Sequence, residues 1–453
     1  MLKRLCSVGL DVGTTTTQLI VSELAVENKA SAFAVPEMTI ADRQILYKSP
    51  VHFTPLLDDA HVDGDGIRDI VTREYAVAGI RRGDVDTGAI IITGETSRKE
   101  NARTVLAALS DFAGEFVVAT AGPDLESILA ARGAGAVEYS ARTGKTVLHM
   151  DIGGGTSNLA LIEDGKITRT GCLNVGGRLL KFDKAGTVTY VSPVLTGLTD
   201  LRVGDRPSNQ QVGSVAKTLT EALEMAAGLR TPTERLSALT TKEIAGPFSP
   251  MNAEVISFSG GVADCIEKNH PPGAFGDMGP ELGNAIRESR LCQGEYVLGT
   301  ETIRATVIGA GCHSTQLSGS TVFYRSVSFP MKNLPVVTVS PADQIVPEQI
   351  RQRLSTHDTT PVLALPGYPS AGYAQVQALA DAIVRSIPEG PVYLTVEQDM
   401  AKALGQALGL RLEPNRPVLC LDRLHLEEGS YLDVGAPVGP ALPVVIKTLI
   451  LER

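Results

Sequence analysis

Two segments of this sequence combine aspartate, glycine and hydroxyl residues in the same order. The first reads Asp11-Val12-Gly13-Thr14-Thr15-Thr16-Thr17, and the second reads Asp151-Ile152-Gly153-Gly154-Gly155-Thr156-Ser157. Each is flanked by short apolar and β-branched runs, a pattern typical of a tight turn that closes a β-hairpin. Glycine lets the backbone approach an anion closely, and successive N–H groups in such a turn form an anion-binding concavity. We therefore expect both segments to bind phosphate.

The side chains of these segments extend the same chemistry. Hydroxyl groups would donate to phosphate oxygens from Thr14, Thr15, Thr16 and Thr156, beside the backbone of Gly13, Gly153, Gly154 and Gly155. The carboxylates of Asp11 and Asp151 could hold Mg²⁺ through its water molecules, because Mg²⁺ prefers oxygen ligands and keeps several waters. A single turn of this kind is common and would be weak evidence. Two copies indicate two duplicated lobes that grip one polyphosphate from both sides.

Alternating strand and helix patterns divide the chain into three predicted regions, 1–146, 147–330 and 335–453. The predicted strands are Ser7–Leu10, Thr17–Ser22, Ala89–Thr93, Phe116–Thr120, Val147–Ile152, Asn158–Glu163, Lys166–Thr170, Glu254–Ser259, Val336–Val339, Val362–Leu365, Val392–Val396, Val418–Leu421 and Val444–Leu451. Helical patterns cover Glu100–Phe112, Asp124–Ala131, Val212–Met225, Arg304–Cys312 and Thr395–Leu408. Strands that alternate with helices predict mostly parallel sheets flanked by helices.

The composition describes a globular protein with an acidic surface. Of the 453 residues, 43% are hydrophobic and 20% are charged, and the formal net charge is −10. This charge argues against nonspecific binding to nucleic acid or to anionic membranes, and the lack of Trp removes a favoured base-stacking side chain. No apolar run approaches the roughly 18 residues of a membrane span. The six scattered cysteines include no CxxC pair, which favours reduced thiols in the cytosol.

Two further segments resemble functional motifs only in part. The sequence Asp63-Gly64-Asp65-Gly66 begins like a calcium loop, but Arg68 replaces its obligatory glycine, so we expect an ordinary turn. The sequence Leu432-Asp433-Val434-Gly435 echoes the first hairpin, but it lacks threonine hydroxyls and is followed by Pro437. We expect no third phosphate turn there. The basic residues Arg98, Lys99 and Arg103 could meet phosphate, or could form a solvated helix face.

The two turns resemble the phosphate loops of the actin, sugar-kinase and heat-shock-chaperone ATPase superfamily. Further segments resemble its other elements in the expected order. Val255–Ala263 resembles the adenosine motif, Asp124–Tyr139 and Ala305–Gly311 resemble the two interlobe helices, and Asn174–Gly177 resembles the Gly-Gly turn that follows the second hairpin in chaperone relatives. The resemblance covers about residues 5–315. It implies a two-lobed actin-like ATPase fold with duplicated ribonuclease H-like lobes, followed here by an additional C-terminal α/β region.

The same resemblance implies roles for individual residues. ATP and Mg²⁺ are the expected ligands, with Asp11 and Asp151 as the catalytic and metal-organising carboxylates. Ser259, Gly260 and Gly261 would lie against the adenosine. An acidic residue of the first interlobe helix would position the attacking water, and Glu126 is the first candidate, with Asp124 as the second.

At finer grain, the whole chain is similar to the reactivating factors of ethanolamine ammonia-lyase. The similarity rests on the runs GLDVGTTTTQLIVS, ITGETSRKENA, HMDIGGGTSNLALI, ISFSGGVADCI and YLDVGAPVGPALPVVIKTLI. The last run, which includes Tyr431–Ile450, lies outside the nucleotide core and distinguishes this family from other superfamily members. The runs together span nearly the whole chain.

This similarity implies a chaperone-like ATPase that releases damaged cobalamin from the lyase and lets intact adenosylcobalamin enter. The expected partner is the lyase itself. The contact surface would be 335–453 or the polar segment 185–215, and the alternative is that 335–453 only packs against the core. The expected location is the cytoplasm or a bacterial microcompartment, and homo-oligomerisation stays open. Two alternatives on the same fold are a phosphotransferase for a small metabolite and an actin-like filament protein.

Overall fold

The computed structural model describes most of the chain. The described residues are 3–13, 16–28, 38–58, 61–93, 101–102, 104–105, 109, 117–120, 123–241, 248–299, 301–313, 315–318, 321–339, 347–354, 359–426, 430–438 and 441–448. The predicted positions Thr14, Thr15, Arg98, Lys99 and Arg103 lie outside these ranges, as does most of the predicted helix Glu100–Phe112.

The first lobe is built on a sheet with the strand order β3-β2-β1-β5-β6. Its strands are β1 (Lys3–Val12), β2 (Thr16–Asn28), β3 (Met38–Lys48), β5 (Thr87–Ile92) and β6 (Val117–Thr120), and the short β4 (His52–Phe53) pairs with β2. Strands β1, β2 and β3 pair antiparallel, whereas β5 lies parallel to β1 and β6 lies parallel to β5. The sheet packs its apolar residues, such as Leu10 and Ile90, against Ile67 and Val71 of α1 (Gly64–Ala78).

The segment Asp63–Gly66 is not the ordinary turn that its composition predicted. Asp63 is the N-cap residue of α1, and its Oδ1 accepts a hydrogen bond from the backbone N–H of Gly66 at 3.0 Å. An aspartate at this position satisfies an N–H group that has no partner within the helix. The apolar residues Ile67, Ile70 and Val71, spaced for one face of a helix, then bury against the sheet.

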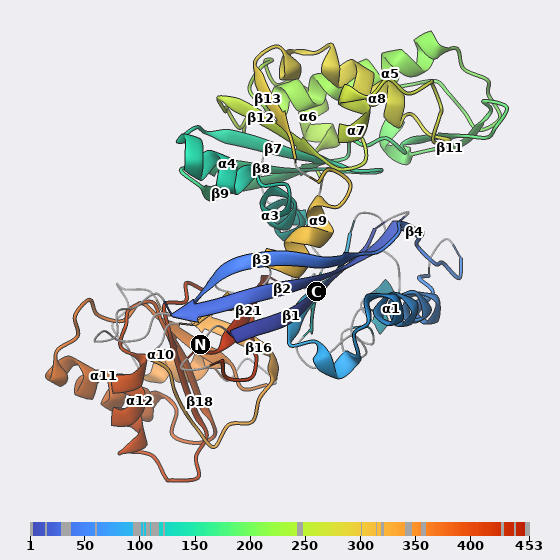
Figure 1. The fold of residues 1–453 in the computed structure, drawn as a ribbon. Coiled ribbons are helices and arrows are strands. Elements are labelled where there is room, and N and C mark those ends of the chain that lie inside the picture. Colours follow the sequence, from blue (N-terminus) through green and yellow to red (C-terminus); the bar gives the residue numbers. More distant parts are fainter. Residues whose placement is uncertain are drawn as a thin grey trace.

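The second lobe repeats the topology of the first. Its sheet has the order β9-β8-β7-β12-β13 and is formed by β7 (Val147–Ile152), β8 (Ser157–Glu163), β9 (Lys166–Leu173), β12 (Val255–Ser259) and β13 (Glu295–Leu298). Strands β7, β8 and β9 pair antiparallel, and β12 lies parallel to both β7 and β13. Two sheets with the same order and the same pairing senses confirm the predicted actin-like fold of duplicated lobes (Figure 1).

Helices and a small hairpin complete the second lobe. The helices are α5 (Asn209–Ala226), α6 (Glu234–Leu239), α7 (Ala263–Glu267) and α8 (Gly279–Arg287). Ser208 and Gln211 form a capping box at the start of α5, which then buries Leu219 and Leu223 in a core shared with Phe258 of β12. A two-stranded arm of β10 (Leu180–Phe182) and β11 (Val188–Val191) extends to one side (Figure 1).

Two helical segments lie between the lobes (Figure 1). They are α3 (Pro123–Gly133), which is followed by α4 (Ala136–Thr143), and α9 (Ala305–Ile308), which continues as a π-helical turn over Gly309–His313. Their backbones touch where glycines leave room. A Cβ atom at Gly133 would lie 1.8 Å from the carbonyl oxygen of Ala305, and one at Gly309 would lie 2.1 Å from that of Leu129. Small residues therefore allow the close helix crossing that the sequence predicted.

The third sheet has the order β14-β21-β20-β16-β17-β18-β19-β15. Its strands are β14 (Gln316–Leu317), β15 (Phe323–Arg325), β16 (Met331–Thr338), β17 (Val362–Leu365), β18 (Val392–Val396), β19 (Val418–Asp422), β20 (Ser430–Val434) and β21 (Pro443–Thr448). Strands β16 to β19 run parallel, and the helices α10 (Pro347–Leu354), α11 (Tyr373–Ser386) and α12 (Ala401–Gly409) connect them. The last helix begins at Ala401 and not at Thr395, because Thr395 and Val396 complete β18.

None of the helices in the described ranges combines the length and the apolar character that crossing a bilayer would require.

Candidate functional site

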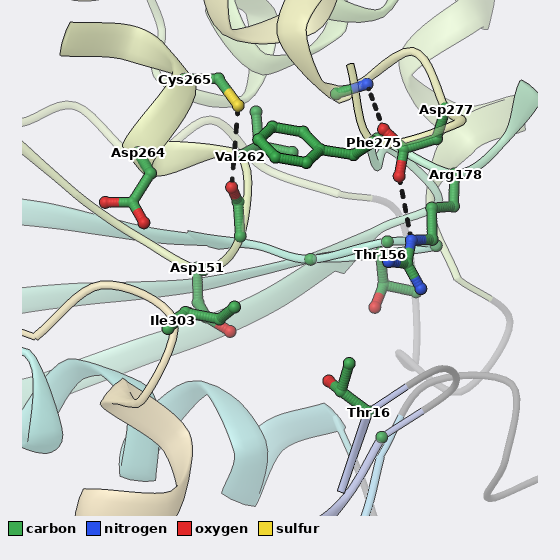
Figure 2. Close-up of a pocket in the computed structure, with 18 of the residues that line it drawn as sticks. Thr16, Asp151, Thr156, Arg178, Val262, Asp264, Cys265, Phe275, Asp277 and Ile303 are labelled. Atoms are coloured by element: carbon green, nitrogen blue, oxygen red, sulfur yellow. Dashed lines mark hydrogen bonds and ion pairs between the residues drawn. The ribbon is translucent and has the colours of Figure 1, made fainter. Parts of the chain in front are cut away.

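A pocket of about 390 Å³ lies between the first and second lobes. Both predicted hairpins line it. The first, between β1 and β2, contributes Asp11, Gly13 and Thr16, and the second, between β7 and β8, contributes Asp151, Gly153, Gly154, Gly155 and Thr156. Gly260 and Gly261, which follow β12, line the same pocket, as does Glu126 of α3. Figure 2 shows Thr16 facing Asp151 and Thr156 across the space between the lobes. The structure thus brings together residues from four separate segments of the chain.

The two hairpins have equivalent local geometry. In the first, Asp11 pairs with Gln18 in the ladder, and the N–H of Gly13 donates to the carbonyl oxygen of Thr16 at 2.9 Å. In the second, Asp151 pairs with Asn158, and the N–H of Gly153 donates to the carbonyl oxygen of Thr156 at 2.9 Å. Each aspartate therefore stands at the end of a buried strand, directly before the turn. The shared spacing of aspartate and glycine in the sequence reflects a shared backbone.

The carboxyl groups of Asp11 and Asp151 each accept a hydrogen bond from a hydroxyl group. The hydroxyl of Thr93 donates to Asp11 Oδ1 at 3.0 Å, and the hydroxyl of Ser259 donates to Asp151 Oδ1 at 2.5 Å. Burial raises the pKa of Asp11 to about 7, against the opposing hydrogen bond from Thr93 and with a further contribution from the Asp151 charge. Burial likewise raises the pKa of Asp151 to about 6. A cation bound in the pocket would favour the ionised form of both carboxyl groups.

These oxygens fit the demands of Mg²⁺. The ion needs few protein ligands because it retains several water molecules, and the pocket offers two carboxylates with room between the lobes. Within the described parts of the chain, no group of three or more His, Cys, Asp or Glu residues is arranged to hold a metal ion.

Two glycines in the turn after β12 line the pocket. Gly260 has a positive φ of 87°, and a Cβ atom there would lie 2.3 Å from the carbonyl oxygen of Ile152, so only glycine fits. Gly261 differs, because a Cβ atom added to it would meet no heavy atom within 4 Å. Ser259, the last residue of β12, is fully buried and contacts Asp151 instead of lining the pocket. Gly261 therefore leaves open space at this part of the pocket lining.

Replacing Gly261 with valine is expected to block nucleotide binding without unfolding the protein. The backbone tolerates a side chain there, but that side chain would project into open space where the adenosine is expected. We expect ATP affinity to fall by about tenfold or more, which corresponds to about 1.4 kcal/mol. Titration calorimetry measures the affinity, and thermal unfolding checks the fold. Unchanged ATP affinity would place the nucleoside elsewhere.

Glu126 is a half-buried residue of α3 that reaches the pocket from the crossing of the interlobe helices. Its role in positioning a water molecule stays a prediction from the superfamily resemblance. The side chain of the second candidate, Asp124, lies outside the described residues.

Several pocket residues were not identified from the sequence. They include Gln18, Thr93, Arg178, Asp264, Lys268, His270, Phe275, Asp277, Ile303 and Thr306. For two of them, the sequence or the strand pairing could have indicated a position near the hairpins. Thr93 follows β5, which runs parallel to β1, so its hydroxyl had to fall near Asp11. Arg178 directly follows the Gly176-Gly177 turn that the superfamily resemblance had already singled out.

Two lobes of one topology, joined by crossing helices and enclosing a pocket with paired phosphate-type hairpins, define an actin-like protein with a nucleotide-type site. The chain belongs to the family of the ethanolamine utilisation protein EutA, whose model matches residues 3–452. It is 39% identical over 470 residues to the ethanolamine ammonia-lyase reactivase EutA of Salmonella typhimurium, covering 99% of this chain and 98% of the relative. The Escherichia coli reactivase EutA is 38% identical over 476 residues, with the same coverage.

The solved structures that resemble this chain do so only distantly. An Aquifex aeolicus Ppx/GppA phosphatase is 12% identical and covers 68% of this chain and 99% of its own, with a TM-score of 0.40. The ethanolamine utilization protein EutJ from Carboxydothermus hydrogenoformans is 19% identical and covers 67% of this chain and 88% of its own, with a TM-score of 0.32. At these values, the fold assignment rests on the strand order of the two lobes.

Proposed function

We propose that this protein reactivates ethanolamine ammonia-lyase by ATP-dependent release of damaged cobalamin and exchange for intact adenosylcobalamin. The observation that carries the proposal is the match to reactivases of that enzyme at 39% identity over 99% of the chain. The match includes the third region, which lies outside the two nucleotide-type lobes. No observation favours the phosphotransferase or filament alternatives. The protein works where the lyase works, in the cytoplasm or in a microcompartment.

The pocket supports this proposal because its residues fit the parts of Mg²⁺-ATP. Asp11 and Asp151 would hold the ion, and a bound Mg²⁺ would neutralise phosphate charge. The N–H groups of the two hairpins cradle the phosphates, with hydroxyl groups of the hairpin threonines beside them. Gly260 and Gly261 lie against the adenosine. Glu126 accepts a hydrogen bond from the water that attacks the terminal phosphate and so orients it.

The lobes provide a way to convert nucleotide binding into movement. Each hairpin belongs to a different lobe, so both contact one polyphosphate only when the lobes are closed. A ligand shifts such an equilibrium by the difference between its affinities for the two states. The crossing of α3 and α9 is the contact about which the lobes would rotate. Closure and reopening would then alter the lyase bound at another surface, for which the third region is one candidate.

A recovery assay tests the proposed function. Ethanolamine ammonia-lyase inactivated by cyanocobalamin is incubated with the purified chain, ATP, Mg²⁺ and adenosylcobalamin, and the return of lyase activity is followed. We expect recovery that requires all four additions and a slow basal ATPase in the absence of the lyase. Control reactions omit ATP or replace the chain with albumin. If the complete mixture restores no activity, the reactivase proposal is wrong.

A further inference from the structure

One arginine lies inside the pocket, and its backbone is fixed to the second hairpin. The N–H of Arg178 donates to the carbonyl oxygen of Gly154 at 2.7 Å, and that of Gly177 donates to Gly153 at 3.0 Å. A Cβ atom at Gly176 would lie 2.3 Å from the carbonyl oxygen of Gly154, so the two turns touch. The Arg178 side chain lies over Gly154, where an added Cβ would be 3.3 Å from Arg178 Cδ.

The guanidinium of Arg178 is oriented by a buried carboxylate. Its Nε donates to Asp277 Oδ2 at 3.0 Å, and the other Asp277 oxygen accepts from the N–H of Gly279 at 2.9 Å (Figure 2). The side chain of Asp277 is only 8% exposed, while that of Arg178 is 27% exposed. Within the described residues, no other hydrogen bond involves the side chain of Arg178. The Nη1 and Nη2 groups therefore remain available as donors toward the pocket.

Acidic residues outnumber basic residues in the described lining of the pocket, so an anionic ligand there needs a cation beside it. Among the described lining residues, the acids are Asp11, Glu126, Asp151, Asp264 and Asp277, whereas the permanent cations are Arg178 and Lys268. The side chain of Lys268 is 66% exposed and pairs with Asp264 at 3.7 Å. A polyphosphate carries several negative charges, and Mg²⁺ offsets only part of them. Arg178 is the cation held against a phosphate-type hairpin.

We propose that Arg178 directly contacts the phosphate groups of the bound nucleotide, and that Asp277 is a positioning residue that aims its guanidinium. This inference rests on the proposed nucleotide site and adds to it a group that recognises phosphate. A guanidinium bound to a carboxylate through Nε keeps a pair of terminal N–H groups, which match two phosphate oxygens. Lysine offers a point charge without this fork, so it should replace arginine only in part.

The test compares ligands that share the nucleoside but differ in phosphate. Calorimetric titration of the full chain with ATP, ADP and adenosine in Mg²⁺ buffer is repeated for Arg178→Gln and Arg178→Lys. We expect Arg178→Gln to weaken ATP binding by about 10- to 100-fold, as for loss of a charged hydrogen bond, and to leave adenosine binding unchanged. Arg178→Lys should lie between. Arg169→Gln, which removes an arginine that donates to the backbone of Ser249 and Pro250, is the matched control.

Asp277→Asn tests the positioning role. Alone, it should weaken ATP binding less than Arg178→Gln and should spare adenosine, whereas in the Arg178→Gln background it should add no further loss. Unchanged ATP affinity in Arg178→Gln, or an equal loss for ATP and adenosine, would overturn the inference. A wild-type chain that binds ATP but restores no lyase activity overturns only the proposed function. A wild-type chain that binds no ATP overturns both.

Discussion

Replacing Asp11 with asparagine is expected to slow the ATP-dependent recovery of ethanolamine ammonia-lyase strongly while the protein stays folded. The amide keeps the shape of the side chain and can still accept the hydrogen bond from Thr93. It removes one of the two carboxylates proposed to hold Mg²⁺, and we expect the recovery rate to fall by about 100-fold, at the upper end of losses seen for groups around a metal. Because burial raises the pKa of Asp11 to about 7, the loss of charge should cost little stability. The recovery assay and thermal unfolding measure the two effects.

Asp433 offers a matched control for this substitution. Leu432-Asp433-Val434-Gly435 repeats the Leu-Asp-Val-Gly sequence of Leu10–Gly13, and Asp433 is also buried. Its Oδ1 accepts a hydrogen bond from the N–H of Asn333 at 2.5 Å, which an asparagine can also accept. Asp433→Asn should therefore keep full recovery. Equal loss in both variants, or full recovery in Asp11→Asn, would contradict the assignment of Asp11.

Replacing Gly309 with alanine is expected to destabilise the protein and to disturb the crossing of the interlobe helices. The added Cβ atom would lie 2.1 Å from the carbonyl oxygen of Leu129, so the backbones of α9 and α3 must separate. Inserting a methyl group into a close-packed contact typically costs about 1–3 kcal/mol. Urea unfolding measures the free energy. Because the crossing joins the lobes, ATP should also stabilise this variant less than it stabilises the wild type.

Gly213 provides the control for this glycine substitution. It lies in α5, and a Cβ atom there would meet no heavy atom within 4 Å. Gly213→Ala should raise the free energy of unfolding by about 0.5–1 kcal/mol, because alanine loses less backbone entropy in a helix. If Gly309→Ala behaves like Gly213→Ala, the helices do not meet at Gly309 as the structure describes.

The strands could be predicted more closely than the helices, for a physical reason. Strands β7, β17 and β18 begin and end where their apolar runs do, because each run is buried on both faces and is bounded by polar or turn residues. The start of α1 was mistaken for a turn, since the aspartates and glycines at its cap resemble a turn in composition. The helix predicted over Arg304–Cys312 exists, but its second half is π-helical beside Gly9.

The sequence by itself determined the two hairpins and the elements that carry them, because Gly and Asp spacing and strand periodicity act through neighbouring residues. Those features predicted duplicated lobes with helix-flanked sheets, whereas the actin-like fold and the family came from resemblance to known proteins. Only the tertiary structure decided which side chains meet at the pocket. Arg178 and Asp277 are 99 residues apart, and Thr306 reaches Asp151 over 155 residues. Such contacts, and the raised pKa values of buried carboxylates, depend on how sheets and crossing helices pack, which no local spacing encodes.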